Sequence, residues 1–331
     1  MPQSCLITGA TGFVGGHLAE ACVARGIQVH ALARAGSDVA LLEKLDVTLH
    51  RGDLIDSAIV SQAVKSVDAV IHCAAKVGDW GPVEEYRTTN VEALRKLLDI
   101  CKGRPLQRFV HLSSLGVYPA RNHYGTDESE PLPVNHMDGY TQTKVEAERL
   151  ALDYHRQHGV PVVVLRPGFI YGPRDRTVLP NLIDNLRERR VRWIGGGRGA
   201  MNTIYVGNLV DAIFLALEKP NAIGQVYNLT DCEIVSKRRF IQTLVNGLDL
   251  PKPPLLGAPI WLARLVAQYM ENRARHRGSP APPLLTQGRV KFLGLNLNFS
   301  IEKAKRELGY QPQVSFEQGM EKTIAWVRQG M

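Results

Sequence analysis

The sequence is poor in cysteine. Its 331 residues include 5 cysteines, an odd number, and no two of them form a CxxC pair. Disulfide frameworks and zinc sites need cysteines in paired or regular spacings. We therefore expect buried, reduced thiols in a cytoplasmic protein, with no disulfide and no metal site.

Long hydrophobic runs are also missing. A membrane-spanning helix needs about 18 consecutive apolar residues, and the nearest candidate, 255–270, contains Pro259 and Arg264. The first predicted strand begins at Ser4, which leaves no room for a signal peptide before it. We therefore expect neither a spanning helix nor a cleaved leader.

Charge of one sign is in modest excess. The chain has 40 Lys and Arg against 32 Asp and Glu, a formal net charge of +8, with local bunching at 187–192 and 273–277. A basic balance can attract anionic substrates, nucleic acids or membrane surfaces. No basic segment is interleaved with aromatic residues, so we expect no nucleic-acid partner.

What the sequence does contain is an alternation of strand-like and helix-like segments. Apolar runs of strand length followed by helical periodicity are typical of a parallel sheet with helices on both faces. Right-handed crossovers then give an α/β fold with a doubly wound parallel sheet. We predict strands at 4–8, 27–33, 47–51, 69–73, 108–113 and 161–166, and helices at 16–25, 56–65, 84–102 and 141–158.

The pattern changes after about residue 173. A helix at 178–189 is followed by a helix at 208–218 and a strand at 225–229, which resemble returns to the sheet, and 236–296 is rich in proline. We interpret the later part as a smaller lobe over the strand ends, where ligands of such sheets bind. The predicted division is a nucleotide-binding domain at 1–175 with returns at about 205–230, and a substrate lobe built from 176–204 and 231–331.

A glycine-rich turn connects the first predicted strand to the first helix. Gly9, Gly12 and Gly15 follow the strand in a GxxGxxG spacing. Gly9 permits a tight turn, Gly12 lets the backbone approach a pyrophosphate, and Gly15 lets the helix pack close to the strand. The free N–H groups at the start of the helix favour a negatively charged ligand. The strand-turn-helix context therefore predicts a dinucleotide site.

The residue after the second strand bears on the choice of nicotinamide cofactor. NAD sites usually place a carboxylate there, on the ribose 2′-hydroxyl. Here the strand ends with Ala33 and Arg34, and no carboxylate appears before Asp38. Arg34 can meet a 2′-phosphate, so we expect NADP to be preferred to NAD.

Tyr140 and Lys144 start a predicted helix, and positions i and i+4 share one helix face. A nearby cation stabilises phenolate and lowers the tyrosine pKa from about 10, which makes the phenol a usable general acid or base for a carbonyl/alcohol pair. Ser113 and Ser114 end the fifth strand, where one hydroxyl can bond the reacting oxygen and the other can cap the strand.

These motifs together resemble the extended short-chain dehydrogenases/reductases, the NAD-dependent epimerase/dehydratase superfamily. Within them, the chain is most similar to the 3β-hydroxysteroid dehydrogenase and sterol 4-carboxylate 3-dehydrogenase branch. The resemblance covers essentially the whole chain and implies a Rossmann nucleotide-binding fold. It rests on 8–15, 52–54, 72–75, 90–91, 113–114, 140–144, 165–175, 204–208 and 303–310.

The resemblance also implies roles for individual residues. Ser114, four residues before Tyr118, matches the catalytic hydroxyl beside Tyr140 and Lys144, and Asn90 matches an asparagine that supports a proton relay. Asp53 matches a contact to the adenine ring, and 167–170 should line the nicotinamide. The complete set of implied cofactor-binding residues is Gly9, Thr11, Gly12, Phe13, Val14, Gly15, Arg34, Asp53, Leu54, Ala74, Ala75, Tyr140, Lys144, Pro167, Gly168 and Ile170.

We therefore predict an NAD(P)-dependent oxidoreductase that transfers a hydride between nicotinamide and a secondary alcohol or ketone of a hydrophobic substrate, with steroids and sterols as candidates. The alternative is a UDP-hexose epimerase that retains NAD, since epimerases share the same catalytic residues. Sugar dehydratases place an acidic pair where this chain has Leu115 and Gly116, so the general acid for water elimination is missing here. A third possibility is a nucleotide-sensing regulator on the same fold. Such proteins commonly lack the Tyr/Lys pair, so Tyr140 and Lys144 argue against it.

The segment 255–277 carries an apolar stripe followed by a basic cluster. Trp261, Leu262, Leu265 and Tyr269 recur at helical spacing, and four basic residues follow at 273–277. The segment is either a lid whose apolar face closes over the substrate or the core, or a helix that docks on an anionic membrane. In the first case these side chains form the roof of the pocket. The sequence leaves open both membrane association and a homodimer.

Overall fold

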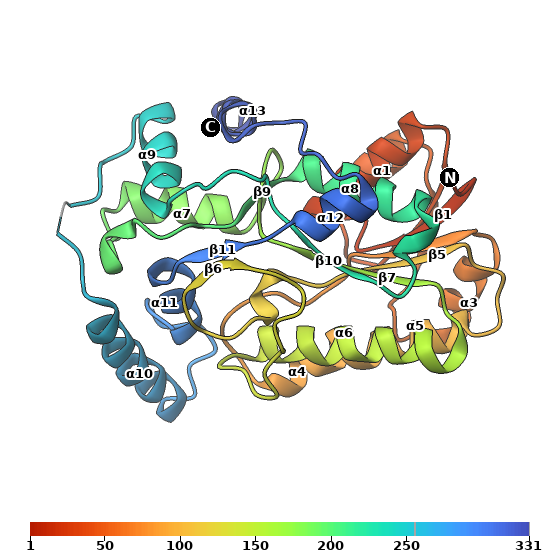
Figure 1. Cartoon of the computed structure of the whole chain (residues 1–331), viewed down its shortest axis with the longest axis horizontal. Helices are drawn as coiled ribbons and strands as arrows, with labels where there is room; N and C mark the ends of the chain where they lie inside the picture. The colour runs from red at the N-terminus through yellow and green to blue at the C-terminus, as the bar shows by residue number, and fades with distance from the viewer. Residues whose placement is uncertain (255, 331) are drawn as a thin grey trace.

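The computed structural model describes residues 1–254 and 256–330. Seven parallel strands form the central sheet in the order β10-β7-β5-β4-β1-β2-β3 (Figure 1). The sheet extends from β1 in both directions, which confirms the predicted doubly wound α/β fold. The strands are β1 (Ser4–Thr8), β2 (Gln28–Ala33), β3 (Thr48–Arg51), β4 (Ala69–His72), β5 (Arg108–Leu112), β7 (Val162–Pro167) and β10 (Val226–Leu229).

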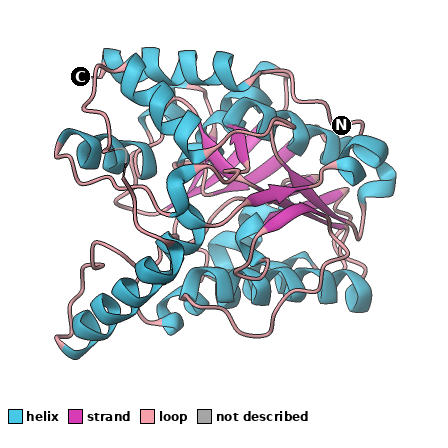
Figure 2. Ribbon diagram, turned by 60° about the vertical axis from the view of Figure 1, so that its left-hand side comes forward, coloured by secondary structure: helices cyan, strands magenta, loops and turns pink. Residues whose placement is uncertain are grey.

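Helices cover both faces of this sheet, so the strands lie between two helical layers (Figure 2). Buried apolar side chains on each face form a separate core cluster, because a fully buried parallel sheet must be covered on both sides. One face carries α1 (Phe13–Ala24), α2 (Ala40–Lys44), α8 (Val206–Glu218) and α12 (Glu302–Leu308), and the other carries α3 (Ser57–Lys65), α5 (Ala93–Cys101) and α6 (Gly139–His158).

The later part of the chain adds helices beyond the strand ends, on the left of Figure 1. Two of them, α9 and α13, share a core cluster with α7. The division of the chain into a nucleotide-binding domain and a substrate lobe stays a prediction. The helices are α7 (Val178–Arg187), α9 (Lys237–Gly247), α10 (Ile260–His276), α11 (Gln287–Gly294) and α13 (Phe316–Gln329).

Two short parallel strand pairs were not predicted from the sequence. They join segments far apart in the chain, β6 (His123–Thr126) with β11 (Leu297–Phe299) and β8 (Phe169–Tyr171) with β9 (Thr203–Tyr205). Strands of three or four residues carry too little periodicity to be recognised. Their pairing is decided by long-range contacts.

Two predicted helices differ in detail from those in the structure. The glycine turn ends at Gly12, which is the N-cap of α1, so Gly15 lies inside the helix. The predicted helix 84–102 is divided into α4 (Val83–Arg87), a π-helical turn η1 (Thr88–Glu92) and α5. A π turn inserts an extra residue into the helical ladder and is common at functional sites.

The cysteines agree only in part with the prediction of buried thiols. Cys5, Cys22 and Cys101 are buried and Cys73 is half-buried, but Cys232 is exposed. Cys232 has a φ of 60° in the loop that follows β10, and its place in that loop was not evident from its neighbours. Over residues 1–254 and 256–330, no helix is long and apolar enough to cross a membrane.

Candidate active site

The predicted site residues gather at one edge of the central sheet. Parallel strands bring their carboxyl ends to the same edge, and the strand order reverses at β1. Gly9 follows β1, Ala74 follows β4, Ser114 follows β5 and Gly168 follows β7. Segments separated by more than 150 residues therefore meet around one crevice region, which is where open α/β sheets bind their ligands.

The glycine turn is shaped by close backbone approaches. Gly9 has a φ of 72°, and an added Cβ would lie 2.8 Å from the backbone nitrogen of Ala74. A Cβ on Gly15 would overlap the carbonyl oxygen of Gly9, so Gly15 packs against the turn itself rather than against the strand. Gly12 is exposed, and an added Cβ there would lie 3.2 Å from the carbonyl oxygen of Gly9. The turn is thus closed at its flanks and accessible at the start of α1, as a pyrophosphate needs.

Tyr140 lies in the first turn of α6, which begins after the N-cap Asp138. Its phenol lies near the Ser114 side chain, whose Oγ accepts a 3.0 Å bond from the backbone nitrogen of Gly116. Burial raises the pKa of Tyr140 to about 12, the nearby Ser114 hydroxyl opposes this rise, and the charge of Asp138 adds to it. The phenol therefore keeps its proton at neutral pH.

Lys144 lies one helical turn after Tyr140 and is buried. Its Nζ donates a 2.7 Å hydrogen bond to the carbonyl of Leu112 at the end of β5. Burial lowers the pKa of Lys144 to about 8, against the opposing effects of Cys73 and Glu148. The prediction that this cation lowers the pKa of Tyr140 is wrong, because burial of the phenol dominates and that pKa lies above 10 rather than below it.

Ser113 belongs to a buried polar network behind the candidate site. Its Oγ donates a 2.7 Å bond to Oε2 of Glu148, and Nε of Arg166 donates to the same oxygen at 3.0 Å. Arg166 also donates to the hydroxyl of Tyr118 at 2.7 Å. Sequence reasoning missed Glu148 and Arg166. The signal was available, since Glu148 follows Lys144 by four residues and Tyr140 by eight, on the same helix face.

Asn90 lies in the π turn η1 and is buried. Its Oδ1 accepts a 2.7 Å bond from the backbone nitrogen of Lys76, and its Nδ2 donates to the Lys76 carbonyl at 3.1 Å and to Oγ1 of Thr143 at 3.0 Å. The side chain ties the segment after β4 to α6. Within the described residues it bonds neither Tyr140 nor Lys144, so its part in a proton relay stays a prediction.

The residues expected to hold the adenosine half lie at the ends of two adjacent strands. Arg34 follows β2 and is exposed, and Asp53 follows β3, with Oδ1 accepting a 3.2 Å bond from the backbone nitrogen of Ile55. Asp38, the first carboxylate after β2, forms a 3.1 Å ion pair with Arg176. Leu54, next to Asp53, is half-buried, and so are Ala74 and Ala75 after β4.

The segment expected to line the nicotinamide follows β7. A Cβ on Gly168 would overlap the carbonyl oxygen of Asn202, and its backbone nitrogen donates a 2.9 Å bond to the Leu229 carbonyl. Pro167 is buried and Ile170 is half-buried. Thr11, Phe13 and Val14 of the glycine turn are also half-buried.

The apolar stripe of the 255–277 segment is exposed on α10. Leu255 lies outside the described residues. The buried side of α10 consists of Ala263, Ala267 and Glu271, while the larger apolar side chains point away from the core. The expectation that this stripe could close over the core is therefore wrong. The small side chains of Ala263 and Ala267, rather than the large apolar ones, face the rest of the protein.

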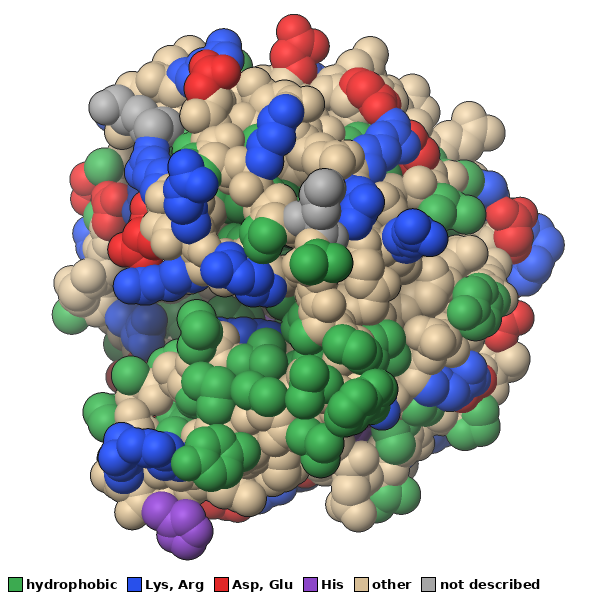
Figure 3. Space-filling model, turned by 90° about the vertical axis from the view of Figure 1, so that its left-hand side faces the viewer, with side chains coloured by type: hydrophobic (Ala, Val, Ile, Leu, Met, Phe, Trp, Pro, Cys, Tyr) green, Lys and Arg blue, Asp and Glu red, His purple; other side chains and the backbone are tan. Residues whose placement is uncertain are grey.

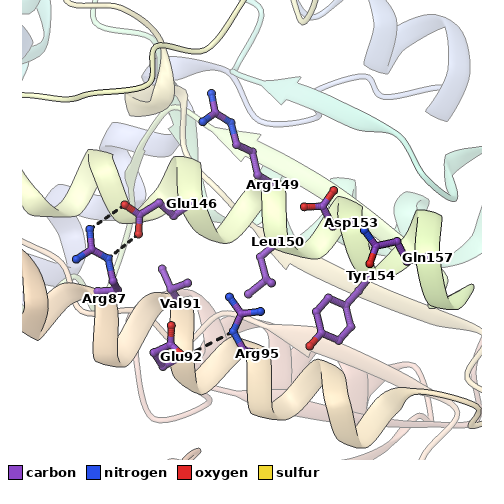
Figure 4. Close-up of a pocket in the computed structure, with 10 residues that line it drawn as sticks. All are labelled: Arg87, Val91, Glu92, Arg95, Glu146, Arg149, Leu150, Asp153, Tyr154 and Gln157. Carbon is purple, nitrogen blue, oxygen red and sulfur yellow. Dashed lines mark hydrogen bonds and ion pairs between the residues drawn. The ribbon is translucent and has the colours of Figure 1, made fainter.

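A pocket of about 450 Å³ lies between α6 and the helical segment formed by α4, η1 and α5 (Figure 4). Charged side chains dominate it, including an ion pair of 2.9 Å between Arg87 and Glu146. None of the predicted site residues lines it. It therefore lies apart from the candidate active site.

Comparison with known proteins places the chain in a family. A family model described as "NAD dependent epimerase/dehydratase family" matches residues 5–230. The chain belongs to this family. The description of the family includes dependence on NAD, which supports a nicotinamide cofactor without deciding between NAD and NADP.

Two relatives cover nearly the whole chain. A "4-hydroxy-2-methyl-3-oxo-4-farnesyl-3,4-dihydroquinoline-1-oxide ketoreductase" of Stigmatella aurantiaca is 34% identical over 95% of this chain and 94% of its own. A "3 beta-hydroxysteroid dehydrogenase/Delta 5-->4-isomerase" of Mycobacterium tuberculosis is 31% identical over 97% of this chain and 89% of its own. These relatives confirm the predicted extended short-chain dehydrogenase/reductase, its branch and its oxidoreductase class.

A solved structure shares the fold. The UDP-glucuronic acid 4-epimerase from Bacillus cereus, in complex with UDP-glucuronic acid and NAD, has a TM-score of 0.78 and 24% identity, covering 99% of this chain and 100% of its own. At this identity the likeness shows the fold alone. It does not favour the epimerase alternative.

Proposed function

We propose that the protein is a ketone reductase that uses NADPH and also catalyses the reverse oxidation of the alcohol. The observation that carries this proposal is the placement of Tyr140 beside Ser114, with Lys144 one helical turn further along α6 and bonded to the Leu112 carbonyl at 2.7 Å. Both hydroxyls belong to the carboxyl edge of the sheet, and the phenol is protonated at neutral pH. A protonated phenol is a general acid, which is the group that ketone reduction requires.

Each residue of the site has a defined task in this reaction. The reduced nicotinamide supplies a hydride to the carbonyl carbon when it is bound. Tyr140 transfers its phenolic proton to the carbonyl oxygen, which completes the alcohol, and the Ser114 hydroxyl donates a hydrogen bond to that oxygen. The Lys144 ammonium, held on the Leu112 carbonyl, retains donors for the nicotinamide ribose.

The preference for NADP rests on Arg34 and Asp38. Arg34 is exposed at the end of β2, where it can meet a 2′-phosphate with a planar guanidinium. Asp38 is bonded to Arg176 and to the backbone nitrogen of Ala40, so it is held by protein partners rather than offered to a ribose hydroxyl. Both observations favour the phosphorylated cofactor.

The proposed substrate is a hydrophobic small molecule with a ketone or secondary alcohol. The names of the two relatives contain a farnesyl-bearing quinoline oxide and a hydroxysteroid, which are both large apolar structures. The family resemblance alone carries this choice to the present chain. Steroids and prenylated ketones are the substrates to test first.

The epimerase alternative would need cations for a sugar diphosphate. Arg174 and Arg176 are the arginines that could supply them. In the structure Arg174 forms an ion pair with Glu20 and Arg176 pairs with Asp38. Because both guanidinium groups already have carboxylate partners, the geometry favours the reductase.

The deciding experiment follows reduced-nicotinamide absorbance. Purified protein mixed with NADPH and a hydrophobic ketone should consume the two in equal amounts, while a Tyr140→Phe variant should not. An epimerase would instead convert a UDP-sugar with no net absorbance change and no added cofactor. That result would overturn the proposed function and leave the fold standing.

A further inference from the structure

The helix α10 presents its large apolar side chains to solvent. Trp261, Leu265 and Tyr269 are 64%, 62% and 63% exposed, and their spacing of four places them on one face. Leu262 and Val266 border them and are exposed as well. A helix that packs its small residues inward and its large ones outward reverses the usual amphipathic pattern.

This apolar face is part of a larger surface. Leu256 and Leu284, from the segments on either side of α10, are also exposed. Hydrophobic side chains gather on this side of the molecule beside a hollow that Lys and Arg side chains border (Figure 3). Single exposed hydrophobic residues are normal in proteins, but a contiguous group rimmed by polar residues marks an interaction surface.

The exposed charge of the segment that carries the apolar face is positive. Between residues 250 and 300 the chain has seven Lys and Arg but one carboxylate, Glu271. Lys291 is buried and Arg289 pairs with Asp79 at 2.8 Å, so the exposed cations are Lys252, Arg264, Arg273, Arg275 and Arg277. That carboxylate is buried, where it accepts a 2.7 Å bond from the backbone nitrogen of Gln287 and pairs with Arg275 at 3.2 Å. Arg273 lies one turn after Tyr269 and donates to its hydroxyl at 3.3 Å. Positive charge therefore lies directly at the border of the apolar face.

We propose that this face docks on an anionic lipid bilayer. The apolar side chains of α10 enter the boundary between headgroups and acyl chains, and the neighbouring arginines contact lipid phosphates. Trp261 and Tyr269 suit that boundary, because each has an apolar ring with a polar atom. The proposal is independent of the redox chemistry proposed above.

Two other occupants fit the same face less well. A second copy in a two-fold dimer would set this positive surface against itself. A lid that turned the stripe inward would have to withdraw Glu271 from its buried bond to Gln287. An anionic bilayer satisfies both the apolar side chains and the surrounding charge.

The test uses the full chain and lipid vesicles. Trp261 is the exposed one among four tryptophans, because Trp193 is buried and Trp80 and Trp326 are half-buried. Vesicles that contain phosphatidylglycerol should shift the tryptophan emission to the blue, and the shift should be lost in Trp261→Phe. Vesicles of phosphatidylcholine alone should bind more weakly, and added salt should weaken binding to the anionic vesicles.

Sedimentation with the same vesicles measures the affinity. Leu265→Asp should lower it about tenfold or more, since an apolar contact is replaced by a charge that anionic lipid repels. Ile55→Asp is the matched control, because it adds the same charge at an exposed apolar residue just before α3, which lies at the opposite end of Figure 1 from α10, and it should leave binding almost unchanged. Circular dichroism should confirm that both variants are folded.

Three outcomes would overturn the proposal. The first is wild-type protein that does not bind anionic vesicles. The second is Leu265→Asp protein that binds them as tightly as wild type. The third is a Leu265→Asp protein that changes from dimer to monomer, or that has a raised KM for a hydrophobic ketone, when the wild-type protein does not bind vesicles. A change to monomer would assign the face to a second copy, and a raised KM would assign it to a lid. Ketone-dependent NADPH oxidation, measured without vesicles, separates each of these from failure of the proposed reductase.

Discussion

The Nζ atom of Lys144 lies 2.7 Å from the backbone carbonyl oxygen of Leu112, to which it donates a hydrogen bond. This bond joins α6 to the carboxyl end of β5. Ser114 follows Leu112 by two residues, and Tyr140 precedes Lys144 by one helical turn. One buried, charge-assisted contact therefore holds together the two elements that carry the candidate catalytic hydroxyls.

Replacing Tyr140 by Phe should remove the proton donor while leaving the ring in place. We expect the rate of ketone reduction to fall by about 10²–10⁴-fold and cofactor affinity to stay almost unchanged. Steady-state kinetics with NADPH and fluorescence titration of the cofactor measure the two effects. Tyr124→Phe is the control, since Tyr124 is exposed on β6. A Tyr140→Phe enzyme with most of its activity would show that the mechanism is wrong.

The two serines after β5 should respond differently to the same change. Ser114→Ala removes the hydroxyl beside Tyr140 and should lower the rate by about 10²-fold or more with little change in stability. Ser113→Ala breaks the buried bond to Glu148 and should cost about 1–3 kcal/mol of unfolding free energy. Turnover and urea unfolding of both variants test this. Equal loss of activity in both would contradict the assignment.

Cofactor affinity should depend on pH through Lys144. Burial lowers the pKa of Lys144 to about 8, so its ammonium is present below that pH and is lost as the pH rises through it. We therefore expect affinity for NADPH to be highest below about 8 and to decline above it. Tyr140, with a pKa of about 12, stays protonated over this range.

Lys144→Ala provides the control for this pH dependence. The variant should bind NADPH roughly ten- to hundredfold more weakly, as expected for the loss of a charge-assisted bond, and its affinity should no longer decline around pH 8. Titrations of the cofactor across this range compare the two proteins. Unchanged affinity together with an unchanged pH profile would exclude the role of Lys144.

Arg34 should determine the preference between the two nicotinamide cofactors. We expect the wild-type protein to favour NADP(H), and Arg34→Ala to weaken NADP(H) roughly ten- to hundredfold while leaving NAD(H) almost unchanged. Arg121→Ala, an exposed arginine paired with Glu130, is the control. Wild-type protein that uses NAD(H) equally well would refute the proposed preference.

The ion pair between Arg166 and Glu148 should dominate the stability of the region behind the site. Both side chains are buried, so Arg166→Met leaves an unpaired carboxylate and should cost about 3–5 kcal/mol of unfolding free energy. Arg121→Met breaks an exposed pair and should cost no more than about 1 kcal/mol. Urea unfolding of the two variants measures the contrast. Similar losses of unfolding free energy in the two variants would show that the buried pair stabilises the fold no more than an exposed pair does.

Much of the sheet and of the candidate site could be predicted from the sequence, because the relevant signals are local. The strand, the glycine turn and the helix from Ser4 to Ala24 occur in one short stretch, and the spacing of Tyr140 and Lys144 places them on one helix face. Parallel strands then bring their carboxyl ends to one edge, so the meeting of Gly9, Ser114 and Tyr140 follows from the order of the elements. These features needed no knowledge of distant contacts.

Other features depend on contacts between distant segments, and only the tertiary structure decided them. Ser113 is bonded to Glu148 rather than to the site, because α6 crosses the end of β5 at that point. Burial, which no local pattern reports, raises the pKa of Tyr140 above its usual value. The stripe on α10 was visible as a pattern, but a pattern does not say which side of a helix meets the protein. The structure packs Ala263 and Ala267 inward and leaves Trp261 and Leu265 in solvent. The spacing of residues within a helix determines which side chains share a face, whereas the packing of the whole chain determines whether that face meets the protein or the solvent.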